Sequence, residues 1–154
     1  MNTKITAEKG KQDINVERIF KASPNQVYHL FTDPDLIVQW QGNEFRFITF
    51  DGRNGGNYES SHIGPDGNTY GFKGVYHELI PNQTIIRTSE FLGLPFKVIP
   101  TLEIYQFEPL DVDLTQLTIQ IICNSEEVRD AMVQHGMQAQ FDTIFSNADK
   151  LLHS

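Results

Sequence analysis

Residues 125–152, SEEVRDAMVQHGMQAQFDTIFSNADKLL, form the longest helical pattern in the chain. Apolar residues recur along it at intervals of four, three, four and three, as on one face of an α-helix: Met137, Phe141, Ile144, Ala148 and Leu151. We expect one continuous helix, about 40 Å long at ~1.5 Å per residue. A helix of that length must lie along the face of a sheet. A curved sheet that wraps around it can enclose a cavity, and this predicted cavity is where we look for function.

The chain before this helix is mostly a run of predicted strands. Alternating apolar residues bounded by turn signals mark a first strand at residues 13–22 and six more at residues 44–50, 57–63, 69–80, 83–91, 98–108 and 114–124. Glycine-rich turns are indicated at residues 51–56 and 64–68. Gly74 lies inside a predicted strand, which suggests a bulge or the close approach of another group.

Two short helices are predicted between the first and second strands. Ser23 can cap the first helix, and Pro24 suits its first position. Asp33 and Pro34 end that helix and begin a second one, which carries Trp40. The predicted order is β-α-α-β6-α. This order is typical of the α+β class, with an antiparallel sheet whose helices lie on one face.

Length and composition limit the possible functions. A chain of 154 residues fits one domain, which we place at residues 13–154 behind a flexible tail at residues 1–12. The net charge of −8 argues against nucleic acid or an anionic membrane surface as a partner, because both attract basic proteins. No apolar run reaches the ~20 residues of a membrane-spanning helix, and the N-terminus lacks the apolar segment of a secretory signal. Because Cys123 is the only cysteine and cannot form an internal disulfide, we expect a cytoplasmic location.

Several short motifs follow one another along residues 13–152: Phe20-Lys21-Ala22-Ser23-Pro24, Phe31-Thr32-Asp33-Pro34, Trp40 with Gly42, Asp51-Gly52-Arg53-Asn54-Gly55-Gly56-Asn57-Tyr58, Pro65-Asp66-Gly67, Gly74-Val75-Tyr76-His77-Glu78-Leu79-Ile80-Pro81 and Gly136-Met137. Together they resemble the AHSA-like group, named after activators of a heat-shock chaperone ATPase, within the SRPBCC (START-like, helix-grip) superfamily. The resemblance implies a helix-grip fold, in which a curved antiparallel sheet wraps around a long C-terminal helix.

The superfamily shares a pocket and no single reaction. Its members include binders of lipids and small molecules, polyketide cyclases and co-chaperone domains. The resemblance therefore implies a ligand cavity between the sheet and the C-terminal helix. Two places near that cavity depart from the group's pattern: Trp40-Gln41-Gly42-Asn43, where Trp-Trp-Gly-Pro is common, and Gln140-Phe141, where Gly-Trp is common. The ligand can therefore differ from that of a relative.

The sequence carries no motif for catalysis, a metal or a cofactor, and we assign none of the three. None of the five histidines has the spacing of paired metal ligands. Cys123 shares a strand face with apolar residues, so we expect it to be an inert buried thiol. A polyketide cyclase-like enzyme would need an inward acid or base, for which His62, Arg87 and Glu90 are the only candidates. We therefore expect a binding protein more than an enzyme.

The predicted site consists of aromatic and polar residues expected to face the cavity. Tyr58 and Tyr70 would offer hydroxyls, Met137 would adapt to the shape of a ligand, and Trp40 and Phe141 would help to close the pocket. The complete set is Trp40, Tyr58, His62, Tyr70, Phe72, Arg87, Phe91, Phe107, Met137 and Phe141. For the aromatic residues the alternative is an ordinary core position. For His62 it is an exposed or core position, and for Arg87 a surface position.

The predicted partner is a small apolar or aromatic molecule or a lipid. The alternative is a co-chaperone-type interaction module that contacts a chaperone through the outer face of the sheet or the surface of the final helix, with acidic residues meeting a basic patch. The sequence does not distinguish a monomer from a homodimer.

Overall fold

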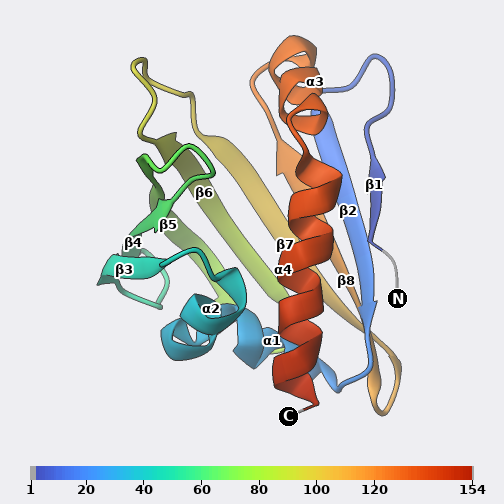
Figure 1. Cartoon of the computed structure of the whole chain (residues 1–154). Helices are drawn as coiled ribbons and strands as arrows, with labels where there is room; N and C mark the ends of the chain where they lie inside the picture. Colours follow the sequence, from blue (N-terminus) through green and yellow to red (C-terminus); the bar gives the residue numbers. More distant parts are fainter. Residues whose placement is uncertain (1–2, 154) are drawn as a thin grey trace.

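The computed structural model describes residues 3–153 and contains eight antiparallel strands in one curved sheet, with four helices beside it (Figure 1). The strand order is β1-β2-β8-β7-β6-β5-β4-β3. The strands are β1 (Lys4–Thr6), β2 (Asp13–Phe20), β3 (Arg46–Phe50), β4 (Asn57–Ile63), β5 (Thr69–Ile80), β6 (Thr84–Leu92), β7 (Thr101–Asp111) and β8 (Leu114–Ile122). The helices are α1 (Pro24–Thr32), α2 (Pro34–Gln41), α3 (Glu126–Gln134) and α4 (Met137–Leu152). This is the predicted α+β helix-grip fold, with one extra strand and a divided final helix.

The first two helices begin where the sequence predicts. The Ser23 hydroxyl accepts a hydrogen bond from the backbone N–H of Gln26, and the Gln26 side chain accepts one from the backbone N–H of Ser23. This capping box satisfies N–H groups that the start of a helix leaves free. Asp33 ends α1 and caps α2 by accepting from the N–H of Asp35 at 2.9 Å. The two helices therefore follow one another directly and lie together at one end of the sheet (Figure 1).

The prediction of one continuous helix over residues 125–152 is wrong, because α3 and α4 are separate. Gly136 lies between them with a φ of 82°, a left-handed conformation that glycine adopts without strain. A lone glycine in an apolar repeat is often tolerated inside a helix, so the pattern does not mark this break. Ser125 caps α3 by accepting from the N–H of Val128 at 3.1 Å.

The flexible tail predicted at residues 1–12 contains a strand instead. Strand β1 pairs with β2, and Ile5 lies opposite Val16. The guanidinium of Arg129 on α3 donates hydrogen bonds to the carbonyls of Glu8 and Lys11, which are 121 and 118 residues away in the sequence. Because these partners are so distant, no local pattern predicts them. Residues 1 and 2 lie outside the described part of the chain.

Aromatic side chains fill the core between the sheet and the helices. The ring of Phe31 on α1 lies at their centre, with centroid distances of 5.1–6.2 Å to Phe20, Trp40, Tyr105, Phe107 and Phe145. Phe145 belongs to α4, so this cluster joins α4 to α1 and the sheet. Within the described residues, no helix is long and apolar enough to cross a membrane.

Candidate functional site

The inner face of strands β4–β7, on the side of the sheet where the helices lie (Figure 1), carries most of the predicted site residues. In the sheet register His62 lies opposite Tyr70, Phe72 opposite Phe91, and Tyr76 opposite Arg87. Residues that lie opposite one another point to the same face, and alternate residues along a strand share a face. Tyr58, His62, Tyr70, Phe72, Arg87, Phe91 and Phe107 therefore share this face, as the alternation predicts.

Five half-buried side chains form what we call the His62 cluster: Phe45, His62, Tyr70, Phe72 and Phe91. The imidazole of His62 stacks on Phe72 and on Phe45, with centroid distances of 5.6 and 6.3 Å and interplanar angles of 17° in both pairs. Tyr70 and Phe91 stack on each other at 5.5 Å. Because each of these side chains is only half-buried, the cluster leaves part of its apolar surface accessible.

His62 also has a ring nitrogen without a partner. Its Nδ1 is buried and makes no hydrogen bond within the described residues. Burial lowers the pKa of His62, so the imidazole is neutral at pH 7. Unpaired buried polar atoms are rare in folded proteins, because each costs about 1–3 kcal/mol. A polar group on a ligand can satisfy such an atom.

Arg87, Glu103 and Tyr105 form a hydrogen-bonded group on β6 and β7 that we call the Arg87 triangle. Arg87 Nε donates to Glu103 Oε1 at 2.7 Å, and Arg87 Nη2 donates to the Tyr105 hydroxyl at 3.0 Å. The Tyr105 hydroxyl donates to the same Glu103 oxygen at 3.2 Å. Burial raises the pKa of Tyr105 well above its ordinary value, which keeps this hydroxyl protonated. The guanidinium lies 5.0 Å from the ring centroid of Tyr58, within the range of a cation–π contact.

A chain of rings connects the Arg87 triangle to the His62 cluster. Tyr58 packs on Tyr76 at 5.2 Å, and Tyr76 packs on Phe50 at 5.9 Å. The contacts continue from Phe50 to Phe47 at 4.9 Å and from Phe47 to Phe45 at 5.3 Å. The two groups therefore belong to one continuous aromatic surface.

Small residues lie between the two groups on the inner face. Ser60 and Ser89 are buried there, and Gly74 lies on the strand between them. The Tyr58 side chain passes over Gly74, and its hydroxyl donates to the carbonyl of Thr88 at 2.8 Å. A Cβ on Gly74 would lie 1.9 Å from that carbonyl oxygen and 2.9 Å from the Tyr58 hydroxyl. The close approach predicted at Gly74 is therefore confirmed.

Two of the predicted residues lie in the aromatic core and not beside the His62 cluster. Trp40 is buried, and its indole N–H donates to the carbonyl of Leu30 at 2.8 Å. Phe107 is buried beneath α1, with its ring 5.4 Å from that of Tyr28. Trp40 has no open face or free polar group to offer a ligand, and Phe107 borders only the surface pocket beside α1.

Met137, Phe141 and Tyr70 differ in how much of each side chain is accessible to a ligand. Met137 is buried at the start of α4, whereas Phe141 is half-buried with its ring 5.2 Å from that of Phe145. The Tyr70 hydroxyl, predicted to face a ligand, instead donates to the carboxylate of Asp66 in the β4–β5 turn. Only the ring of Tyr70 therefore belongs to the candidate site.

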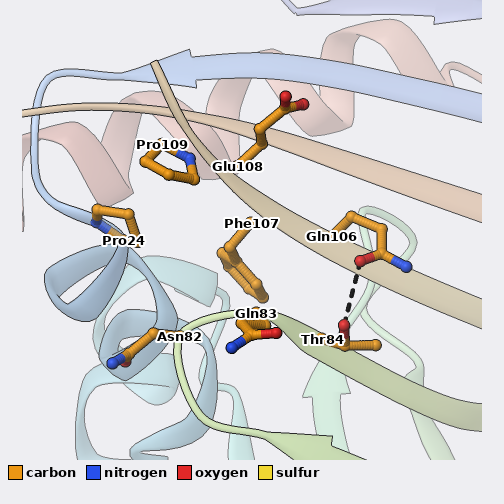
Figure 2. Close-up of a pocket in the computed structure, with 8 residues that line it drawn as sticks. All are labelled: Pro24, Asn82, Gln83, Thr84, Gln106, Phe107, Glu108 and Pro109. Atoms are coloured by element: carbon orange, nitrogen blue, oxygen red, sulfur yellow. Dashed lines mark hydrogen bonds between the residues drawn. The ribbon is translucent and has the colours of Figure 1, made fainter. Parts of the chain in front are cut away.

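Two surface pockets lie away from the His62 cluster. The larger, of about 600 Å³, lies where the start of α1 meets the β5–β6 turn and β7 (Figure 2). Figure 2 shows Pro24, Phe107 and Pro109 around it, and the Thr84 hydroxyl donating to Gln106 at 3.1 Å. The other, of about 330 Å³, lies on the outer face of the sheet. Neither is the cavity predicted between the sheet and the final helix, where aromatic rings fill much of the space.

The three acid–base candidates do not converge. Glu90 lies on the outer face opposite Lys73, and both line the outer pocket. Arg87 and His62 point to the inner face, where Arg87 is engaged by Glu103. Within the described residues, no cluster of three or more His, Cys, Asp or Glu side chains can hold a metal ion.

Residues 21–152 match the family described as activator of Hsp90 ATPase homolog 1-like protein. The chain belongs to this family. The match extends over both candidate groups on the inner face, and it agrees with the resemblance seen in the sequence motifs.

Solved structures of three bacterial proteins share the fold. One from Rhodobacter sphaeroides is 22% identical, with a TM-score of 0.83 over 99% of this chain and 98% of that one. One from Mycobacterium smegmatis is 17% identical, with a TM-score of 0.87 over 97% and 96%. One from Arthrobacter aurescens is 20% identical, with a TM-score of 0.84 over 97% and 91%. At these identities the likeness shows the fold alone. No curated protein matches the chain by sequence.

Five inner-face residues of this family member are absent from the predicted set: Phe45, Phe47, Phe50, Glu103 and Tyr105. The sequence does indicate Tyr76 as a residue that could line the cavity. A signal exists for Glu103 and Tyr105, because they alternate in step with Phe107 along one predicted strand. Phe45 and Phe47 likewise share one side of their strand. What the pattern does not provide is the pairing across strands, which brings Glu103 to Arg87.

Proposed function

We propose that this protein binds a small, largely apolar molecule on the inner face of the sheet, against the His62 cluster. The observation that carries the proposal is the combination of half-exposed rings from several elements with the unpartnered Nδ1 of His62. An apolar ligand covers the rings, and one polar atom of the ligand pairs with that buried nitrogen once the side chains around it move aside. Small binding sites commonly combine apolar walls with a few polar groups in this way.

A small buried area is enough for useful affinity. A ligand that buries ~400 Å² of apolar surface gains roughly 10 kcal/mol at ~25 cal/mol per Å². Association costs at least ~4 kcal/mol, which leaves micromolar binding within reach. No catalytic group is needed to account for such a site, and no reaction is proposed. Cys123 is buried and unpaired, which supports a reducing, cytoplasmic location as part of this proposal.

Native mass spectrometry with a panel of aromatic metabolites and lipids tests the proposal. We expect at least one member to bind, and its binding to shift the NMR signals of His62 and Phe72. Phe91→Ala should weaken that binding by about tenfold, because the ring offers apolar area to the ligand. Phe96→Ala is the matched control, since Phe96 is 66% exposed in the β6–β7 loop. A panel without any binder, or a binder that leaves these signals unmoved, contradicts the proposal.

A second candidate is a protein-interaction module that contacts Hsp90, as the description of the family suggests. Exposed apolar residues favour this candidate: Ile48 on β3, and Phe96 and Ile99 in the β6–β7 loop, are 55–66% exposed. Purified Hsp90 should then be retained by the immobilised protein. Because the chain carries a net charge of −8, retention should weaken as salt rises. Phe96→Asp should reduce retention, whereas Phe91→Ala should not. Failure to retain Hsp90 at low salt removes this candidate.

A further inference from the structure

The Arg87 triangle leaves polar atoms free on the inner face. Arg87 uses Nε and Nη2 within the triangle, while its Nη1 makes no hydrogen bond to the described residues. Oε2 of Glu103 likewise has no partner there, because Oε1 receives both bonds. The Arg87 side chain is 25% exposed and that of Glu103 14%. The triangle therefore presents two donor hydrogens beside one acceptor oxygen, partly accessible and held in place by Tyr105.

The triangle is also balanced in charge. The positive charge of Arg87 is paired with Glu103 at 2.7 Å. Arg18, which also points inward from the sheet, is paired with Asp149. His62 is neutral at pH 7, and the remaining charges of β4–β6 lie on the outer face, as Glu59, Lys73 and Glu90 do. The inner face is therefore close to neutral, although it contains an arginine.

This balance determines which polar groups the site can accept. A carboxylate placed at Arg87 Nη1 would lose its hydration and would also meet the charge of Glu103. A carbonyl or hydroxyl oxygen loses far less hydration and gains the same hydrogen bond. We infer that the ligand is an uncharged molecule with an acceptor oxygen at one end, and that Glu103 is the residue that excludes its carboxylate analogues. The inference rests on the proposed function, because it concerns the same inner face.

The spacing on β6 indicates the form of such a ligand. Arg87 and Phe91 point to the same face and are four residues apart, which corresponds to roughly 13 Å along a strand. Ser89, a small buried residue, lies between them. An oxygen bound at Arg87 thus places the apolar body of the ligand over Ser89 and its far end against the His62 cluster, where a second polar atom of the ligand pairs with His62 Nδ1. A molecule of two or three fused rings with a ketone or hydroxyl has this length.

Two probes of nearly equal shape test the inference: 2-acetylnaphthalene, a neutral ketone, and 2-naphthoate, its carboxylate counterpart. Binding of each is measured by NMR titration at pH 7.5. We expect the unaltered protein to bind the ketone at least about tenfold more tightly than the carboxylate, given the penalty for burying a charge without a partner. This comparison needs no variant and holds even if a substitution in the triangle prevents folding.

Glu103→Gln then identifies the residue responsible. The glutamine retains an oxygen for Arg87 and removes the negative charge, so binding of 2-naphthoate should strengthen by about tenfold while that of the ketone changes little. Glu90→Gln is the matched control, because it removes the same charge from the outer face and should leave both affinities unchanged.

Each outcome of this experiment has a distinct meaning. Equal affinities of the unaltered protein for both probes overturn the inference and leave the proposed function standing. A Glu103→Gln variant that folds but still prefers the ketone over the carboxylate to the same extent also overturns the inference and leaves the proposed function standing. If neither probe shifts the signals of His62 or Phe72, and no member of the wider panel binds, the proposed function fails and the inference fails with it.

Discussion

Arg18 of β2 and Asp149 of α4 form an ion pair that connects the C-terminal part of α4 to the sheet. The side chain of Arg18 is 4% exposed, and that of Asp149 is 33% exposed. The guanidinium also lies 5.2 Å from the ring centroid of Phe20 and 5.8 Å from that of Phe145. A charge therefore occupies an inward position that alternation along β2 would assign to an apolar residue.

Replacing either partner of this ion pair should lower the free energy of unfolding, but by different amounts. Asp149→Asn leaves the buried charge of Arg18 without its partner, and we expect the free energy of unfolding to fall by about 3 kcal/mol. Arg18→Met should lose less, because methionine keeps the apolar packing and Asp149 can turn to solvent. Urea unfolding measures the loss in both variants. Asp113→Asn, in the exposed β7–β8 turn, is the control. A smaller loss for Asp149→Asn than for Arg18→Met would contradict this account.

Two glycines should respond differently to alanine. At Gly74 the new Cβ would overlap the carbonyl of Thr88, so the backbone must move, and we expect a loss of about 3 kcal/mol. At Gly136 the Cβ meets open space but the backbone is left-handed, so the loss should be about 1 kcal/mol. Gly136→Asn should lose less than Gly136→Ala, because asparagine tolerates that conformation better. Thermal unfolding ranks the three variants, and equal losses at the two positions would count against the steric argument.

The regular part of the fold can be predicted from the sequence wherever alternation is bounded by strong turns. The predicted strands at residues 57–63 and 69–80 coincide with β4 and β5. The strand predicted from residue 98 begins only at Thr101, because the preceding loop is apolar yet exposed, with Ile99 55% exposed. Apolar residues in an exposed loop resemble a strand in the sequence, and only the packed structure separates the two.

The candidate site can be predicted in part. Alternation assigns His62, Arg87 and Phe91 to one face, and the structure places them there. It does not distinguish depth: Trp40 and Phe107 have the same apolar character as Phe91 but are buried in the core. Nor does it predict pairing between strands, which is why the contact of Arg87 with Glu103 is absent from the sequence-based site.

His62 should make stability depend on pH. Burial lowers the pKa of His62 in the folded state below the unfolded value of about 6.5. The unfolded chain therefore takes up a proton first as the pH falls. The stability that the neutral imidazole contributes is complete above about pH 6.5 and is lost as the pH falls toward the folded pKa. Urea unfolding between pH 8 and pH 5 should show this loss, and His62→Phe should reduce its slope. His77→Phe, which removes a histidine at an exposed position on β5, is the control. An unchanged slope in His62→Phe would assign the pH dependence to other groups.

Arg129 should hold the N-terminal strand in place. Its side chain is 3% exposed, and it donates to the carbonyls of Glu8 and Lys11 in the β1–β2 connection. Arg129→Met keeps the apolar packing but removes both hydrogen bonds, so β1 should open more often. Amide hydrogen exchange at Ile5 and Thr6 should then become at least about tenfold faster, since losing ~1.4 kcal/mol of local stability changes an opening equilibrium by that factor. Arg53→Met, in the exposed β3–β4 turn, is the control and should leave exchange in β1 unchanged. If Arg129→Met folds and β1 exchanges at its original rate, then pairing with β2 alone holds the strand, and the contact from α3 is dispensable.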